Sequence, residues 1–145
     1  MPSGDFIGTF PVSVYKQRIM LPTQFQKKLT AAAKSTFILT IGFQNTIAAY
    51  SLDNWVIFRD RLQQGTPKDK KMLSNLYKYA TEQQLEGPGR LKISDDLMRV
   101  ADIKDMVEIV GYGTLITIIA KDRNDDTKKN TEENTKEYEQ EDWYL

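Results

Sequence analysis

The chain repeats its own layout after 72 residues, and this duplication constrains its fold more than any other feature of the sequence. The segments VYKQRIMLP (residues 14–22) and EGPGRLKIS (residues 86–94) share one order: a turn, an arginine, an apolar strand and a helix start. This alignment matches Arg18 with Arg90. A unit of about 45 residues cannot bury enough apolar surface to stand alone. We therefore expect two copies of one unit, packed around a pseudo-two-fold axis.

Each copy predicts the element order β-β-α-β-β. In the first copy we expect strands at residues 6–10 and 18–22, a short helix with Pro22 at its first position, and a hairpin that turns at residues 42–45. The apolar face of that helix is predicted from residues at i, i+4 and i+7, which are Phe25, Leu29 and Ala32.

The second copy predicts the same order of elements. We expect a strand-turn-strand unit at residues 82–93, a short helix at 94–103 with Ser94 as its N-cap, and a hairpin at 105–120 that turns near Gly111 to Thr114. Leu97 then matches Phe25 of the first copy, and Gly111 matches Gly42 once a length difference of three residues is allowed.

Two amphipathic helices are predicted between the copies. The first has Asp53 as its N-cap, and the second follows the breaker at residues 65–67. Their apolar faces are Leu52, Trp55, Phe58 and Leu62 in the first, and Leu73, Leu76, Tyr77 and Ala80 in the second. The predicted organisation is an α+β protein with a first repeat at 1–51, a helical pair at 52–81, a second repeat at 82–121 and a disordered acidic tail at 122–145.

The charge is distributed unevenly along the chain. The overall balance of 20 basic and 20 acidic side chains gives no net charge. However, residues 122–145 hold 9 acidic and 4 basic side chains, whereas residues 1–72 hold 10 basic and 4 acidic ones. Any attraction for phosphate should therefore be concentrated in the first half of the chain.

Several chemical classes are excluded because the chain contains neither Cys nor His. Without them there is no disulfide framework, thiolate nucleophile, imidazole base or ordinary zinc site. We expect no cofactor and no metal. The beginning of the chain does not resemble a secretory signal, and no window approaches the roughly 20 apolar residues of a membrane span. A soluble, cytoplasmic protein is therefore expected.

The duplicated pattern resembles the MraZ family of bacterial transcriptional regulators. The likeness covers about residues 4–121, and LEGPGRLKI and VEIVGYG are its most specific pieces. The family signature in each copy is Asp-x-x-x-Arg, usually D-x-K-G-R. The second copy reads EGPGR at residues 86–90, whereas the first reads VYKQR at 14–18, with Lys and Arg kept and Asp and Gly replaced. The resemblance implies two tandem AbrB-like swapped-hairpin half-domains packed with pseudo-two-fold symmetry, plus the additional helices.

DNA binding is the function that this resemblance implies. Members of the family form rings of subunits that bind short direct repeats upstream of the cell-division and cell-wall gene cluster, usually as repressors. Carried over by position, the DNA-binding residues would be Lys16, Arg18 and Arg90. An arginine that ends a β-turn can offer a bidentate fork to phosphate or guanine. Lys27 and Lys28 are further candidates, although a solvated helix face is the simpler explanation for them.

An alternative role for the two arginines is structural, with each one pairing with a carboxylate and bracing its turn. Arg90 has Glu86 in its own turn for this purpose. Arg18 has only Val14 at the matching position, so we expect Arg18 to be the freer arginine. Gln17 replaces the family glycine, and glutamine disfavours the positive φ of such a turn.

Two further readings of the sequence compete with DNA binding. One is a ring-forming interaction or scaffold protein whose first DNA-binding turn has decayed. An enzyme is a distant third, because the adjacent Asp95 and Asp96 should point in different directions on their helix and both favour its N-terminus. The aromatic cluster at residues 138–145 is expected either to belong to a solubilising tail or to act as a docking motif.

Overall fold

The computed structural model describes residues 2–121 of the chain. Its elements, in order, are β1 (Phe6–Ser13), β2 (Arg18–Met20), α1 (Thr23–Gln26), η1 (Ala31–Ala33), β3 (Thr36–Ile41), η2 (Phe43–Asn45), β4 (Ile47–Ser51), α2 (Leu52–Gln63), α3 (Pro67–Tyr79), β5 (Thr81–Gln84), β6 (Arg90–Lys92), α4 (Asp95–Val100), β7 (Met106–Gly113) and β8 (Leu115–Ala120). The tail expected at residues 122–145, with its aromatic end, lies outside the described residues.

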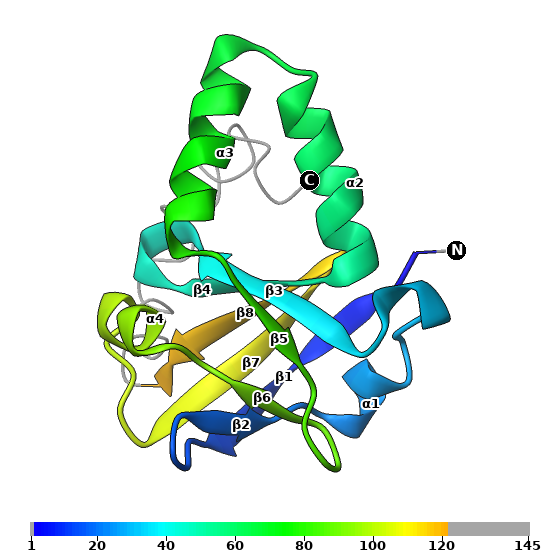
Figure 1. Ribbon diagram of the computed structural model, residues 1–145. Coiled ribbons are helices and arrows are strands. Elements are labelled where there is room, and N and C mark those ends of the chain that lie inside the picture. Colours follow the sequence, from blue (N-terminus) through cyan, green and yellow to red (C-terminus); the bar gives the residue numbers. More distant parts are fainter. Residues whose placement is uncertain (1, 122–145) are drawn as a thin grey trace.

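The fold combines α-helices with antiparallel β-strands (Figure 1). One sheet has the order β1-β7-β8-β4-β3-β5, and β2 and β6 form a separate ribbon. The predicted hairpins are confirmed as β3–β4 and β7–β8. Each hairpin also pairs with a strand from the other half of the chain, since β7 binds β1 and β3 binds β5. Neither half therefore completes a sheet by itself.

The main core draws buried residues from both halves of the chain. Phe25 from α1 and Leu97 from α4 are both almost fully buried, at matching positions of the two repeats. Phe25 contacts Phe6 edge-to-face, with ring centroids 5.5 Å apart. In the ribbon, Ile19 is paired with Leu91, and both side chains enter the same core. The ribbon and the two short helices thus close the core that the sheet leaves open.

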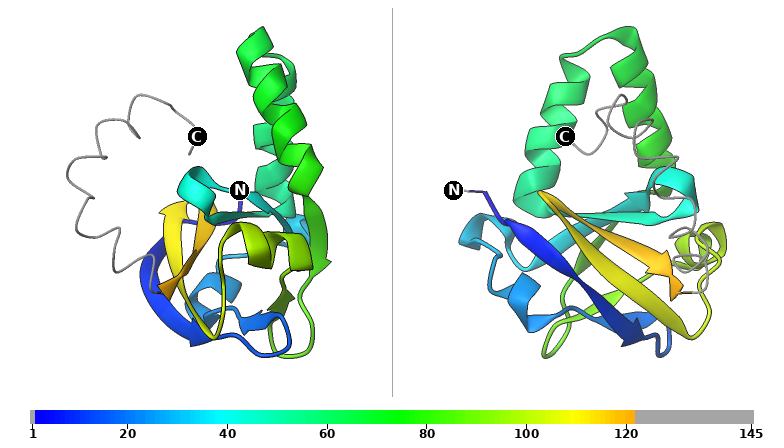
Figure 2. Two further views of the ribbon diagram at one scale, coloured as in Figure 1. Left: turned by 90° about the vertical axis from the view of Figure 1, so that its left-hand side faces the viewer. Right: turned by 180° about the vertical axis from the view of Figure 1, so that it is seen from behind.

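A second apolar cluster attaches the α2–α3 hairpin to the sheet. This hairpin projects from one end of the molecule (Figures 1 and 2). Trp55 and Phe58 pack against Tyr50 of β4, whose ring stacks on Phe58 at a centroid distance of 5.0 Å. The start of α3 is fixed by a capping box between Thr66 and Asp69. Within residues 2–121, no helix is long and apolar enough to cross a membrane.

The helix predicted from Pro22 to Ala32 is wrong beyond its first turn. Pro22 precedes the first helical residue, and α1 ends at Gln26. Thr30 is extended, because its N–H donates to Ser3 Oγ at 3.0 Å and its hydroxyl donates to Asp53 Oδ2 at 3.1 Å. These tertiary bonds replace the intrahelical ones, and the chain then turns again at η1. As a result Ala33 is buried, whereas Ala32 is exposed.

The predicted N-cap role of Asp53 is also wrong. Helix α2 begins at Leu52, with Ser51 at the N-cap and no side-chain cap bond. Asp53 Oδ2 instead accepts hydrogen bonds from Ser3 N at 2.7 Å and from Thr30, and so joins the start of the chain to the helical pair. Burial raises the pKa of the Asp53 carboxyl, but the neighbouring Ser51 hydroxyl and the hydrogen bonds from Ser3 and Thr30 outweigh burial, so its pKa lies below the ordinary value. The Ser94 cap of α4, in contrast, is confirmed, since Ser94 Oγ accepts from Leu97 N at 3.2 Å.

The substitution Asp53→Asn should destabilise the fold in a pH-dependent way. A carboxylate whose pKa is lowered by folding stabilises the protein above its unfolded pKa, near pH 4, and loses this contribution as pH falls through the folded pKa. We expect a loss of about 1–2 kcal/mol near pH 6, because the hydrogen bonds to a charged oxygen are weakened. Urea unfolding at pH 6, 4 and 3 would measure the difference, which should shrink toward pH 3. A difference independent of pH would contradict this role.

Equivalent substitutions in the two repeats should have similar costs. Leu97→Ala should destabilise by about 2–5 kcal/mol and Phe25→Ala by about 3–5 kcal/mol, because each empties a fully buried position of the shared core. Ile57→Ala is the matched control: its side chain is 51% exposed on α2, so a change within about 0.5 kcal/mol is expected. Chemical denaturation of the three variants tests this. If either core variant behaved like the control, its helix would not seal the core.

Candidate nucleic-acid interface

The two signature turns lie at one end of the molecule. Residues 14–18 connect β1 to β2, and residues 86–90 connect β5 to β6. Figure 1 shows both turns at the end opposite the α2–α3 hairpin, on either side of the β2–β6 ribbon. In that ribbon Arg18 is directly paired with Lys92, and Met20 with Arg90. The ribbon thus carries Arg18 from the first half of the chain and Arg90 and Lys92 from the second. We call this ribbon and its two flanking turns, residues 14–18 and 86–90, the basic rim.

The backbone of the rim follows the pseudo-two-fold relation closely. Ile93 N donates to Gln17 O at 2.8 Å, and the equivalent pair, Leu21 N to Gly89 O, measures 2.9 Å. Each turn is therefore held by the strand end of the opposite repeat. Such reciprocal bonds fix both turns to the core, so side chains on them are positioned by the fold rather than by loop sequence alone.

The two turns differ in length by one residue. Tyr15 and Arg18 exchange backbone hydrogen bonds of 2.9 Å in both directions around a two-residue loop. Glu86 and Arg90 are bridged in the same way around three residues. Tyr15 therefore occupies the place of Glu86. The alignment of the two sequence segments had matched Val14 with Glu86, which is wrong by one residue. Val14 packs against the core instead.

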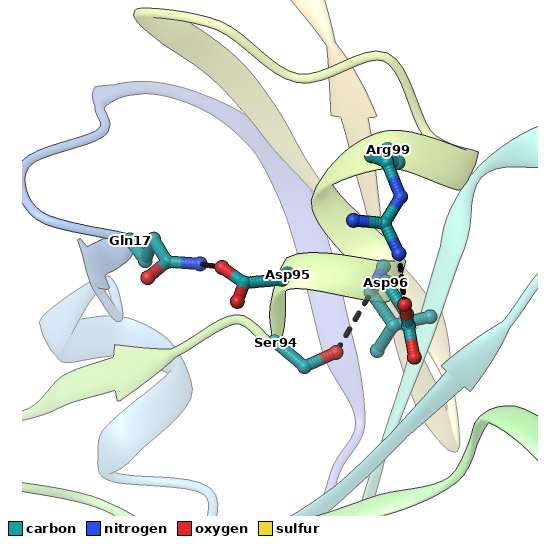
Figure 3. Close-up of polar contacts among 6 residues, drawn as sticks. Gln17, Ser94, Asp95, Asp96 and Arg99 are labelled. Carbon is teal, nitrogen blue, oxygen red and sulfur yellow. Dashed lines mark hydrogen bonds and ion pairs between the residues drawn. The ribbon is translucent and has the colours of Figure 1, made fainter.

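The first turn keeps a left-handed geometry without glycine. Lys16 and Gln17 have φ values of 50° and 63°. The expectation that Gln17 would avoid a positive φ is therefore wrong. Its carbonyl accepts from Ile93, and its side-chain amide donates to Asp95 on α4 (Figure 3). These tertiary bonds compensate for the cost of the left-handed conformation.

The Asp95–Asp96 pair has separate partners, as Figure 3 shows. Asp95 accepts from Gln17, whereas Asp96 forms an ion pair with Arg99 one turn later in α4. The two carboxylates are thus directed to different neighbours. This arrangement braces the first turn on the second repeat, and it does not form a shared carboxylate site.

Arg18 is held in a contact between the repeats. Its Nε donates to Glu86 Oε1 at 2.9 Å, and its Nη1 donates to Lys16 O at 3.0 Å. About a third of its side chain, 34%, remains exposed. The expectation that Arg18 would be the freer arginine is wrong, because its carboxylate partner comes from the other repeat. When the two sequence segments were aligned, only acidic residues within the same turn were considered as partners for each arginine.

Arg90 and Lys92 are the free cations of the rim. Both residues are exposed, and within residues 2–121 their side chains make no hydrogen bond or ion pair. Lys16 is exposed as well, with its ammonium 5.4 Å from the ring centroid of Tyr15. Tyr15 is itself 72% exposed, at the tip of the first turn. The rim therefore offers three accessible cations and one accessible aromatic ring.

Lys27 and Lys28 flank the second turn. Gly89 of that turn lies against the side chain of Gln26, so closely that a Cβ would come within 2.1 Å of Gln26 Nε2. The two lysines directly follow Gln26, and both are exposed. The structure thus places them next to the rim without giving their side chains a described contact.

Sequence reasoning missed Lys92 and Tyr15. Lys92 follows Arg90 by two residues in β6, and Leu91 between them is buried. Alternation along a strand would have placed Lys92 on the exposed face beside Arg90. No comparable signal marked Tyr15, because its position depends on the shorter first turn.

Comparison with known proteins identifies relatives along most of the chain. No family model matches it. A transcriptional regulator MraZ of Alkaliphilus metalliredigens is 31% identical over 136 residues, which cover 88% of this chain and 92% of that protein. The proteins of the same name from Alkaliphilus oremlandii and Clostridium tetani are 32% and 30% identical, and cover 78% and 81% of this chain and 79% and 83% of their own length. These relatives are named as regulators and not as enzymes. The chain therefore belongs to the MraZ family of transcriptional regulators.

Proposed function

We propose that the protein is a DNA-binding transcriptional regulator that contacts duplex DNA through the basic rim. The observation that carries this proposal is the pair of free, exposed cations Arg90 and Lys92, which lie beside Lys16 at one end of the molecule. Membership of a family of transcriptional regulators supports the same assignment. In this proposal the two repeats are tandem AbrB-like swapped-hairpin units at residues 1–51 and 82–121, and residues 52–81 form an appended helical pair.

Electrostatics favours phosphate at this end of the molecule. The rim carries four cationic side chains, Lys16, Arg18, Arg90 and Lys92, against the single carboxylate of Glu86. Lys27 and Lys28 add charge at its side. Cations that neutralise phosphates release condensed counterions, which supplies affinity without sequence preference and makes it depend steeply on salt.

The side chains of the two turns suggest different roles in binding. Arg90 has no partner within residues 2–121, so its guanidinium can present both donors to a guanine edge or a phosphate. Arg18 is oriented by Glu86 and by the carbonyl of Lys16, so its guanidinium is held in place and only its remaining N–H donors can contact a phosphate. We therefore assign base readout to Arg90, phosphate contacts to Lys16 and Lys92, and bracing to Arg18.

Binding by several subunits would raise the affinity. One rim with a few contacts gives weak binding, but a ring of subunits on tandem repeats makes later contacts intramolecular. By its resemblance to the family, the chain is proposed to act as such a ring on short direct repeats upstream of the cell-division and cell-wall gene cluster, as a repressor.

A scaffold function is the second candidate. The observation that favours it is the Arg18–Glu86 ion pair, which removes one signature arginine from direct availability. A ring that works only through protein contacts would keep the fold and the brace, but it would bind the upstream DNA no better than unrelated DNA.

Arg90→Ala should weaken binding to DNA from directly upstream of the gene by about fivefold or more. The loss of one bidentate contact corresponds to about 1–3 kcal/mol and should also relax preference at one base pair. Lys92→Ala should weaken binding evenly across sequences and reduce the slope of log affinity against log salt by about 1. Fluorescence anisotropy titrations at several salt concentrations measure both effects.

The control for these titrations is Lys70→Ala, which removes an exposed lysine of α3 in the hairpin at the opposite end. Its affinity should remain at the wild-type value. Equal effects of Arg90→Ala and Lys70→Ala would reject the rim as the DNA interface. Wild-type protein that binds upstream and unrelated duplexes equally would favour the scaffold function.

Glu86→Gln should strengthen DNA binding while it slightly destabilises the fold. The change removes the only carboxylate that pairs with Arg18 within residues 2–121 and adds one unit of positive charge to the rim. An ion pair this exposed contributes about 0.2–1 kcal/mol, so the unfolding midpoint should fall only a little. The affinity for DNA at low salt should rise above that of wild type, and this gain should diminish as the salt concentration increases. Unchanged or weaker binding would show that the brace matters more than the freed charge.

A further inference from the structure

The described chain ends two strands away from β1, the strand that leads into the basic rim. Three strands lie side by side at this point, with Val12 of β1 paired with Val107 of β7, and Val107 paired with Ala120 of β8. The view from behind in Figure 2 shows these strands together. Val12 lies only three residues before Tyr15 of the first turn. The next segment, residues 122–145, thus starts about two strand spacings, or about 10 Å, from the strand that leads into the rim.

The segment after Lys121 is net acidic, whereas the rim is net basic. Residues 122–145 hold 9 acidic and 4 basic side chains and end in a cluster of aromatic residues. The rim supplies cations without partners together with exposed apolar surface, namely Tyr15 at 72% and Met20 at 42% exposure. A chain of 24 residues can span up to about 80 Å, so its length allows it to reach every part of the rim.

We propose that residues 122–145 bind the basic rim of their own chain and compete with DNA for Lys16, Arg90 and Lys92. The acidic side chains occupy the places of phosphates, and the aromatic end covers Tyr15 and Met20. The docking itself needs only the rim and the segment, whereas its regulatory consequence rests on the proposed function. A covalently linked competitor acts at a high effective concentration, so even a weak contact raises the DNA concentration needed for binding.

A second basic cluster is the main competitor for this segment. Lys68, Lys70 and Lys71 are exposed at the start of α3. They lie in the hairpin at the opposite end of the molecule (Figure 1). Effective concentration falls with the distance that a tether must cover, which favours the nearer rim.

A spin label on the full-length chain tests the docking without DNA. The chain has no cysteine, so Gln140→Cys provides a unique attachment point inside the acidic stretch. At 50 mM salt, the amide signals of residues 15–18 and 89–92 should lose at least half of their intensity to paramagnetic relaxation, and they should recover at 500 mM salt. Broadening centred on residues 68–71, or broadening no greater than in the control variant, would overturn the proposal.

The control variant carries the same label in a segment that has lost six of its nine acidic side chains. Its six acidic side chains between residues 132 and 142 become amides: Glu132, Glu133, Glu137, Glu139, Glu141 and Asp142. All six substitutions lie outside residues 2–121. If the docking is electrostatic, the broadening at the rim should disappear.

Titration with duplex DNA then tests the consequence. With a 30-base-pair duplex from directly upstream of the gene, the variant with six amides should bind at least fivefold more tightly than wild type at 50 mM salt, and the two should converge at 300 mM salt. If labelled rim signals broaden but neither protein binds DNA, the proposed function fails and the docking stands. If DNA binds equally well to both proteins, the segment is not a competitor and the inference fails.

Discussion

The exchange of strands between the two halves is the constraint on which the rest of this structure depends. Each hairpin has an exposed edge that is completed by a strand of the other repeat, β1 on β7 and β5 on β3. Unpaired backbone groups on those edges would otherwise face solvent or another chain. Since the apolar residues of both repeats enter one core, pairing and burial reinforce one another, and each repeat depends on the other for its edge.

The same exchange determines where the signature turns lie. A turn that follows a swapped strand leads directly into the β2–β6 ribbon, so both turns reach one end of the molecule together with their arginines. Reciprocal backbone bonds, from Ile93 to Gln17 and from Leu21 to Gly89, preserve the symmetry of this end. The side chains do not preserve it, because Gln17 binds Asp95 while Gly89 has no side chain to contribute.

This asymmetry explains how one repeat can tolerate a changed motif. Arg18 and Glu86 are drawn from different turns, and their pairing joins the repeats at the rim. Arg90 is then left accessible beside Lys92, on a ribbon whose backbone is fixed by the core. The two turns therefore differ in their contacts: Arg18 is engaged in an ion pair, whereas Arg90 remains exposed.

The two hairpins and the two helices between them could be predicted from the sequence, because hydrophobic periodicity and turn residues act locally. The Ser94 cap was equally local. Only the tertiary structure decided that Thr30 is extended rather than helical, that Asp53 accepts a hydrogen bond from Ser3, and that Glu86 pairs with Arg18. The physical reason is that a polar side chain binds whichever partner the packed core brings within about 3 Å, and a single sequence does not reveal partners that lie 20 to 70 residues away.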